Sequence, residues 1–583
     1  MKKVNYLREL FWAIKTKKLK DFFDSHYDAV NDISLILNQP KNASIHASGI
    51  LITPIEKPIY DWFPCKMMDG VLISEWEGAQ LDDSGFLKVD ILGLNQLDKL
   101  NHMVDLIEIN TKTKIDLQAI YLNVFNVYDL FSKGCIEDVF HFGTDVLSAY
   151  CREVKPTSIL DLAAINALYR PGPMDSGAHN DYVKLRFGKK EPEYDWQCEE
   201  LLKSTYGLIL YQEQAIKMVQ VLAGFTLSEA DNVRKNIGKK LMDKMKLDKD
   251  KFLAGCVERG CEVYEANKIW NKIEVFAGYS FNLSHAVAYS LIGYQTQWIK
   301  YHYPLEFWTI SLQYAGDDEV PKRVSEIHKF NGINLFGPDI NNSKDTFYTN
   351  WETNSIYWSM GRISHLGNVA LEAIIKEREK NGKFFSLEEF VKRTKSQAVN
   401  SRVVKHLILS GAFDALYSVE KPIQRRKIME EFCKLYFSDF LAEIDSEEGY
   451  SDFFWYRLQR DLCGFGQFDY IELVDDFIFA RRQFILPEQI QLTENLEYEG
   501  VITGILISFV KRQTKKGEMA KLILDHNNDL IDVVLWNDSW VQFRKDIEGA
   551  EGKGIILNGR VLYDGYNKKN CIYSFEKTIV QIF

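Results

Sequence analysis

Lys88 and Asp90 are the residues whose types and spacing could do chemistry. They lie in the run GFLKVDILGL at 85–94, whose pattern predicts a short strand ending in a turn. Side chains alternate along a strand, so Lys88, Asp90 and Phe86 share one face. Lysine can hold a phosphate oxygen, and aspartate supplies the hard oxygen ligand that Mg²⁺ requires. The run predicts a phosphate-and-metal site or, as the commoner alternative, a surface ion pair on an edge strand.

Two further segments could bind an anion. The run LYRPGP places Arg170 directly before a rigid Pro-Gly-Pro turn. Residues 234–251 hold eight Lys or Arg against three Asp, a local charge of +5. Such a run is usually a solvated helix face, but Gly238 interrupts it and allows a backbone to approach a ligand closely. The segment therefore indicates either a solvated face or an anionic partner.

Other candidates have equally ordinary alternatives. His46, in the run IHASGILI, could face an active site or be a structural histidine with satisfied hydrogen bonds. The aromatic residues of the helix around Tyr289 could stack on bases, but a stripe at helical spacing is more often core. The turn at Gly367 could offer backbone N–H groups to a DNA phosphate or be an ordinary helical hairpin.

Composition bounds the class of protein. At 583 residues, the length predicts about three to five domains. The net charge of -11 argues against a uniformly basic nucleic-acid binder but leaves local basic tracks open. The nine Cys include no C-x-x-C pair, which indicates reduced thiols in a cytoplasmic location. No apolar run reaches the roughly eighteen residues of a membrane span.

The organisation along the chain predicts an α+β protein that ends in a barrel. Residues 1–40 predict amphipathic helices, and the pattern is mostly helical from 155 to 310. From residue 496 the hydrophobic period changes to two. Five short strands with a basic first hairpin at 511–517 predict a small barrel of the oligonucleotide-binding (OB) type. Barrels of this type combine positive grooves with aromatic platforms.

Ten runs, in order from residue 45 to the barrel, together resemble the alpha subunit of bacterial replicative DNA polymerase III, the C-family DNA polymerases. They are IHASGILI, GFLKVDILGL, DLAAINALYRPGPM, STYGLILYQEQ, AGFTLSEADNVRKNIGKK, FAGYSFNLSHAVAYSLIGYQT, HYPLEF, FGPDINNS, LILSGAFDAL and YEGVITGILISFVKRQTKKGEMA. The resemblance implies five parts: a partial palm with a mixed sheet (1–110), large, mainly helical fingers (111–320), a helix-hairpin-helix region (321–430), a connector (431–490) and a five-stranded OB-type barrel (491–583).

The resemblance also implies residue roles. Asp90 matches the third palm carboxylate, a ligand of catalytic Mg²⁺, of which two ions are expected. Lys88 matches a lysine at the incoming triphosphate. The nucleotide-binding set matched in the fingers is Arg170, Arg234, Lys235, Lys239, Lys240, His285 and Tyr289. The expected DNA contacts are Gly367, Lys511, Arg512, Lys515 and Lys516. The expected partners are primer-template DNA and dNTPs, with no membrane.

Departures from the family pattern matter as much. The family palm has two more aspartates in a Pro-Asp-x-Asp-x-Asp-Phe-like run. The 89 residues before Asp90 do not contain such a run. The phosphoesterase-like domain and thumb are also missing. His141 lies where the family has a Gln-x-Glu-Ser-like run, and Lys235 replaces an arginine. We therefore expect the C-terminal part of a split or phage-type polymerase that needs an N-terminal polymerase chain. A sliding clamp is a further candidate partner, without a convincing clamp-binding pentapeptide.

Two other functions remain open at this point. A non-catalytic DNA-binding replication accessory, or a polymerase remnant, would keep the hairpin and the barrel and leave the catalytic residues vestigial. Retention of Lys88, Asp90, Arg170 and the 234–240 cations argues against long drift. Joining to a second half by protein splicing is a third option, and the start of the chain lacks a Cys- or Ser-led splice junction.

Overall fold

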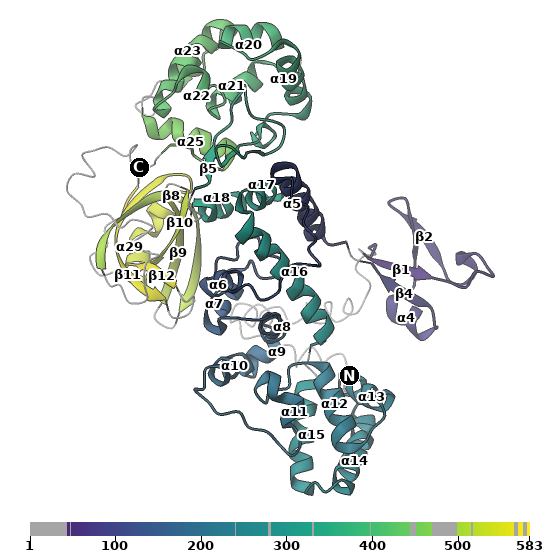
Figure 1. Cartoon of the computed structure of the whole chain (residues 1–583). Coiled ribbons are helices and arrows are strands. Elements are labelled where there is room, and N and C mark those ends of the chain that lie inside the picture. The colour runs from purple at the N-terminus through teal and green to yellow at the C-terminus, as the bar shows by residue number, and fades with distance from the viewer. Residues whose placement is uncertain are drawn as a thin grey trace, which may run out of the picture. The chain divides into compact units, whose positions relative to one another are not determined.

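The computed structural model describes residues 44–46, 48–91, 93–238, 241–277, 281–328, 332–396, 398–443, 451–468, 498–514, 517–526, 528–564, 569–574 and 580–582. The chain divides into two compact units, Met1–Asn95 and Gln96–Phe583, and each is described here by itself (Figure 1). The helices predicted before residue 41 lie outside the described residues, as does most of the later half of the predicted connector. The five predicted domain boundaries stay predictions.

The first unit is built from short strands. Strand β1 (Gly49–Ile52) pairs antiparallel with β4 (Leu87–Asp90), and β2 (Cys65–Met68) pairs with β3 (Val71–Ser74). Helix α4 (Gly78–Asp83) leads into β4. Phe63 is buried and contacts the rings of Trp76 and Phe86, with centroids 6.0 and 5.1 Å away. This aromatic cluster is the small core of the unit.

The second unit begins with a large helical region. Its helices are α5 (Asn95–Thr111), α6 (Phe125–Lys133), α7 (Asp145–Val154), α8 (Ile159–Leu168), α9 (Pro171–Asp175), α10 (Ala178–Arg186), α11 (Glu199–Leu202), α12 (Gln212–Ala223), α13 (Leu227–Gly238), α14 (Met242–Glu258), α15 (Val263–Ala277), α16 (Leu283–His302), α17 (Pro304–Tyr314) and α18 (Val320–His328). Helix α8 is almost entirely buried and packs against α16, where Asn166 donates a hydrogen bond to Ser290 (2.9 Å). Helices α12 to α15 enclose a separate core.

A small sheet and a second helical group follow. Strands β5 (Asn334–Phe336), β7 (Ser355–Tyr357) and β6 (Tyr348–Asn350) form a sheet in that order. The helices after it are α19 (Asn368–Asn381), α20 (Leu387–Thr394), α21 (Ser401–Leu409), α22 (Asp414–Tyr417), α23 (Arg425–Tyr436), α24 (Phe440–Glu443) and α25 (Asp452–Cys463). One hydrophobic core runs from α5 and α17 through this sheet to α23 and α25.

The C-terminal strands form a closed barrel, as the period-two pattern predicts. Strands β8 (Tyr498–Thr514), β9 (Gly517–His526), β10 (Asp529–Leu535), β12 (Lys569–Tyr573) and β11 (Gly554–Asp564) pair in that order, and β11 closes onto β8. Helix α29 (Asn537–Ile547) joins β10 to β11, and β13 (Val580–Ile582) adds to β11. The α+β fold class with a five-stranded barrel is confirmed, and this strand order is compatible with the predicted OB type.

The loop between α6 and α7 is fixed by buried charges. The Asp138 carboxylate lies 2.8 Å from Lys99 Nζ on α5 and 3.2 Å from Arg323 on α18, and all three side chains are nearly inaccessible to solvent. The fully buried Lys300 on α16 donates to the backbone oxygens of Cys135 and Glu137 (3.2 and 3.0 Å), and burial lowers the pKa of Lys300. Three helices therefore hold one loop. Among the described residues, no helix combines the length and the apolar character needed to cross a membrane.

Replacing Asp138 by Asn tests this network. The variant keeps the shape of the side chain but removes the carboxylate that Lys99 and Arg323 share. Arg323 keeps its ion pair with Glu319, whereas Lys99 loses its carboxylate partner, so we expect destabilisation of about 3 kcal/mol. The same exchange at the partly exposed Asp129, which pairs with the exposed Lys133 at 2.6 Å, should cost less than about 1 kcal/mol. Thermal and urea unfolding followed by tryptophan fluorescence compare the two variants. Equal melting of both variants would contradict the network.

Candidate polymerase site

Lys88 and Asp90 lie on one face of the β1–β4 ribbon, as the alternation predicts. In the antiparallel register Gly49 is opposite Asp90, and Leu51 is opposite Lys88. Lys88 Nζ lies 3.0 Å from the nearer Asp90 oxygen, and the Asp90 side chain is about half exposed. Without a ligand, the pair is therefore the surface ion pair of the commoner alternative. Both groups remain accessible to an anion or a cation from solvent.

Gly49 and His46 shape this face. A Cβ atom at Gly49 would lie 2.8 Å from Lys88 Cε, 3.0 Å from His46 Nδ1 and 3.2 Å from Asp90 Oδ1, so only glycine leaves room for the three side chains. His46 Nδ1 accepts the backbone N–H of Gly49 (2.7 Å) and lies 4.0 Å from Asp90. That hydrogen bond gives His46 the structural role, because it requires Nδ1 to be unprotonated.

The donor set around Asp90 does not by itself fit a resident Mg²⁺ ion. Mg²⁺ demands near-octahedral oxygen coordination, and Asp90 is accompanied here by an ammonium and an imidazole. Across the part of the chain that the structure describes, no group of three or more His, Cys, Asp or Glu side chains could hold a metal ion. Asp90 can contribute one ligand to a larger site but cannot form one alone.

Arg170 is held by stacking in the helical region. Helix α9 starts at Pro171, and Arg170 precedes it with extended backbone angles, as the residue before a proline prefers. The Arg170 guanidinium carbon lies 3.4 Å from the centroid of the Phe281 ring, a close cation–π contact. Phe281 is fixed in turn because its backbone N–H and C=O pair with Leu210 and Gln212 (3.1 and 2.9 Å). The proline that follows Arg170 and the Phe281 ring under its guanidinium therefore hold this side chain in place.

Helix α16 brings two predicted residues to the same place. Asn282 caps the helix by accepting the His285 N–H (2.8 Å). The His285 ring lies 5.3 Å from Phe281 and 4.1 Å from Tyr289, between centroids. Arg170, His285 and Tyr289 therefore gather around the first turns of a long helix, and a helix N-terminus is favourable for phosphate.

His141 is a member of this cluster that the sequence did not single out as a site residue. Its ring lies 5.7 Å from that of Tyr289, and its backbone is left-handed, with φ of 67°. The loop can approach α16 this closely because a Cβ at Gly293 would lie only 2.8 Å from the Phe142 ring. Partial burial, then the positive charges of Arg170 and His285, lower the pKa of His141. The only sequence signal was its departure from the family pattern.

The remaining predicted cations are placed differently. Arg234 and Lys235, on α13, both pair with the Asp231 carboxylate of the same helix, each at 2.8 Å. Lys239 and Lys240 lie outside the described residues. Among the described residues, no hydrogen bond, ion pair or ring contact joins Arg234 to the Arg170 cluster. The structure thus brings Arg170, His285 and Tyr289 together, and the role of the α13 cations stays a prediction.

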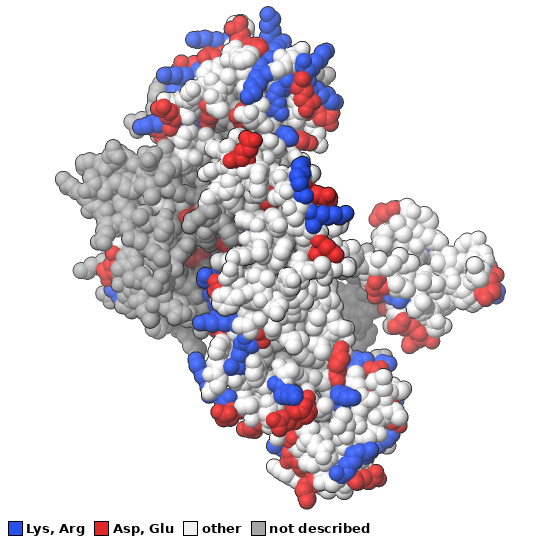
Figure 2. All heavy atoms as spheres, viewed as in Figure 1, with Lys and Arg blue, Asp and Glu red and all other residues white. Residues whose placement is uncertain are grey.

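The predicted DNA-contacting residues lie on the hairpin and the barrel. Gly367 precedes α19, and a Cβ there would meet open space, so the helix N-terminus is accessible. Lys511 and Arg512 are in the final third of β8, where Lys511 pairs with Glu548. Lys515 and Lys516 lie outside the described residues. On the face shown in Figure 2, Lys and Arg are interspersed with Asp and Glu and form no continuous basic track among the described residues.

Three family matches agree with this arrangement. Residues 96–260 match the "Bacterial DNA polymerase III alpha subunit finger domain", residues 332–425 the "Helix-hairpin-helix motif", and residues 7–93 the "Bacterial DNA polymerase III alpha NTPase domain". The chain belongs to the family of the bacterial DNA polymerase III alpha subunit. The predicted family is thereby confirmed.

Curated relatives named "DNA polymerase III subunit alpha" match most of the chain. The Aquifex aeolicus protein is 34% identical over 89% of this chain and 44% of its own length. The Borreliella burgdorferi protein is 30% identical over 95% and 50%, and the Escherichia coli K12 protein is 33% identical over 67% and 35%. The chain therefore spans half or less of the length of these polymerase III alpha subunits.

Substitution of His141 by Asn tests the charge environment of the cluster. Because the folded state lowers the pKa of His141 below its ordinary 6.5, the unfolded chain takes up the proton first as the pH falls. Stability from the neutral ring is fully present above pH 6.5 and is lost as the pH falls through 6.5 toward the lower folded-state pKa. We expect the Tm of the wild-type chain to fall more between pH 7.5 and 5.5 than that of His141→Asn.

Asparagine suits this control because it tolerates the left-handed backbone at position 141. His102→Asn on α5 provides the matched histidine exchange outside the cluster. A pH dependence in His141→Asn that equals that of the wild-type chain would contradict the interpretation.

Proposed function

We propose that this chain is part of a replicative DNA polymerase that performs template-directed DNA synthesis from dNTPs. The observation that carries the proposal is the common face of Lys88 and Asp90 in a chain that belongs to the polymerase III alpha family. In this proposal Asp90 is one ligand of a two-Mg²⁺ centre, and Lys88 exchanges its carboxylate partner for the incoming triphosphate. Phosphoryl transfer needs this combination of metal and cations around the migrating charge.

The other two carboxylates are proposed to come from a separate N-terminal polymerase chain. The second face of the β1–β4 ribbon is aliphatic, which supports a partner chain at this place. By strand alternation this face carries Ile50, Ile52, Leu87 and Val89. The first three are 49–59% exposed, on a ribbon to which the described residues contribute two strands. An aliphatic face of this kind is stabilised when another surface covers it. A palm sheet completed by a partner would cover the apolar face and add carboxylates beside Asp90.

The fingers cluster suits the nucleotide in this proposal. Arg170 and the N-terminus of α16 offer positive charge to phosphates, and His285 and Tyr289 offer a ring surface beside them. His141 stays largely neutral at neutral pH because its pKa is lowered, so it adds a ring without adding repulsion to the cations nearby. Primer-template DNA would contact Gly367, Lys511 and Arg512.

A non-catalytic DNA-binding accessory is the second candidate. One observation favours it: Lys88 is paired with Asp90, and Arg234 and Lys235 are paired with Asp231. Such closed pairs are what a chain without a nucleotide site would keep. The two functions differ in whether Asp90 matters for synthesis.

Asp90→Asn separates the two functions. The assay mixes the chain with a separately expressed polypeptide that carries the two-aspartate run of the family palm, and follows Mg²⁺-dependent primer extension. The chain alone should not extend a primer, and the mixture should. Asp90→Asn should lower extension by about 10³-fold or more, since a metal ion supplies several kcal/mol of transition-state stabilisation, and should leave DNA binding unchanged. Asp82→Asn on α4 is the matched control and should extend normally.

Robust extension by the chain alone would remove the need for a partner. Extension by Asp90→Asn within a few-fold of wild type would remove Asp90 from the metal site and favour the accessory function.

Leu87→Lys tests the apolar face. This side chain is more than half exposed, so the substitution should leave the Tm of the chain unchanged within about 1–2 °C. It should weaken association with the two-aspartate polypeptide by about tenfold or more, because the new ammonium would be buried in the contact. Sedimentation velocity with both proteins measures the association, and Val369→Lys, at an exposed position on α19, is the control. Unchanged association would show that the two-aspartate polypeptide does not cover this face.

A further inference from the structure

Three aromatic rings form a row across the small sheet of the second unit. Phe336 on β5 is opposite Tyr357 on β7, and Tyr357 is opposite Tyr348 on β6. The ring centroids are 5.1 Å apart for Phe336 and Tyr357 and 6.1 Å apart for Tyr357 and Tyr348. Residues directly opposite one another point to the same face, so the three rings share one side of the sheet.

The row lies on the outer face of this sheet. The intervening residues Leu335, Ile356 and Thr349 point the other way, and Ile356 and Leu335 belong to the large hydrophobic core. Phe336 remains 45% exposed, and the two tyrosines are partly exposed. Packing in the hydrophobic core accounts for the inner residues of this sheet. It does not account for three aromatic rings in a row on the face that is exposed to solvent.

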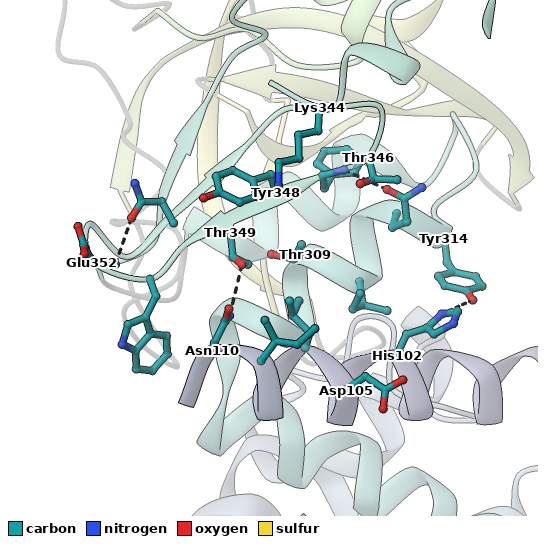
Figure 3. Close-up of a pocket in the computed structure, with 17 residues that line it drawn as sticks. His102, Asp105, Asn110, Thr309, Tyr314, Lys344, Thr346, Tyr348, Thr349 and Glu352 are labelled. Carbon is teal, nitrogen blue, oxygen red and sulfur yellow. Dashed lines mark hydrogen bonds between the residues drawn. The ribbon is translucent and has the colours of Figure 1, made fainter. Parts of the chain in front are cut away.

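A cation and a cavity continue the row beyond β6. Lys344 Nζ lies 4.2 Å from the Tyr348 ring centroid, and Figure 3 shows the Lys344 side chain reaching over that ring. Both residues also line a cavity of about 1040 Å³ between β6 and helices α5 and α17. Its other charged or titratable lining groups are His102, Asp105, Tyr314 and Glu352, so the cavity is not uniformly basic.

We propose that this aromatic row is a binding platform for unpaired bases of single-stranded DNA. The inference rests on the proposed polymerase function, because it assigns a path to the template strand of that enzyme. Base stacking on successive aromatic side chains, with a cation nearby for the backbone, is the general mode of single-strand binding. All three strands lie within residues 332–425, the segment that matches the helix-hairpin-helix motif.

The ring geometry favours single strands over duplex DNA. Stacking needs the open face of a base, and the bases of a duplex already stack on one another. A single cation is also enough here, since stacking carries the affinity and the phosphate is held at one end of the row. An extended proline-rich peptide is the competing occupant of an aromatic surface. The row lies within a segment that matches a helix-hairpin-helix motif, which favours a nucleic acid over a peptide as the occupant.

The first experiment measures binding of the full chain to labelled oligo-dT and to a duplex of equal length, by fluorescence anisotropy. Tyr348→Ala and Tyr357→Ala should each weaken oligo-dT binding about tenfold, since one stacked base contributes ~1–3 kcal/mol. Tyr348→Phe and Tyr357→Phe should retain binding within about twofold, because the ring is kept. Duplex binding should stay unchanged in all four variants. Tyr264→Ala, at a highly exposed tyrosine on α15, is the matched control.

The second experiment uses the wild-type chain, so its result does not depend on whether a variant folds. Oligo-dT containing 4-thiothymidine is photocrosslinked to the wild-type chain, and adducts are mapped by mass spectrometry; we expect them at Phe336, Tyr348 or Tyr357. Adducts confined to the barrel, alanine variants that bind like Tyr264→Ala, or tighter binding of a proline-rich peptide would overturn the platform. If the chain binds neither oligo-dT nor primer-template duplex, the proposed polymerase function fails too, whereas duplex binding without ring dependence defeats the platform alone.

Discussion

A single buried carboxylate determines where the candidate nucleotide cluster can form. Asp138 is held between Lys99 and Arg323, and Lys300 donates to backbone oxygens of the same loop. Charges this deep cost several kcal/mol to desolvate and are tolerated only when paired, so the loop has one stable position. That position places His141 against Tyr289. Helix α16 supplies Lys300 near one end and His285 and Tyr289 near the other, so one rigid element sets both sides of the cluster.

In the β1–β4 ribbon the constraint comes from exposed apolar side chains instead of buried charges. It has a polar face with Lys88 and Asp90 and an aliphatic face with Ile50, Ile52 and Leu87. Two strands give an aliphatic face little to pack against, and a small two-stranded ribbon is marginal by itself. In the proposed function, the same event would cover the apolar face and bring further carboxylates to Asp90: the addition of a neighbouring polypeptide to the ribbon.

The sequence predictions that succeeded depend on patterns among residues that are close together in the chain. Alternation placed Lys88 and Asp90 on one face, and the change of period after residue 496 predicted the barrel, because both depend on neighbouring residues. His141 was missed because its role comes from a left-handed turn and from Tyr289, which is distant in sequence. The row of Phe336, Tyr357 and Tyr348 was also missed, because it too joins residues from separate strands. Each of its strands has only three residues, too few for a periodic signal.

Four of the predicted anion-binding residues share a feature that reconciles an acidic chain with a polyanionic partner: each is paired with a carboxylate. Lys88 pairs with Asp90, Arg234 and Lys235 with Asp231, and Lys511 with Glu548. Pairs that water can reach contribute little to stability, so a phosphate can replace the carboxylate at little cost. Exchange of partners leaves the carboxylate free. At Lys88 the freed group is Asp90, so binding of a triphosphate would release the carboxylate to which the proposed function assigns a metal ion.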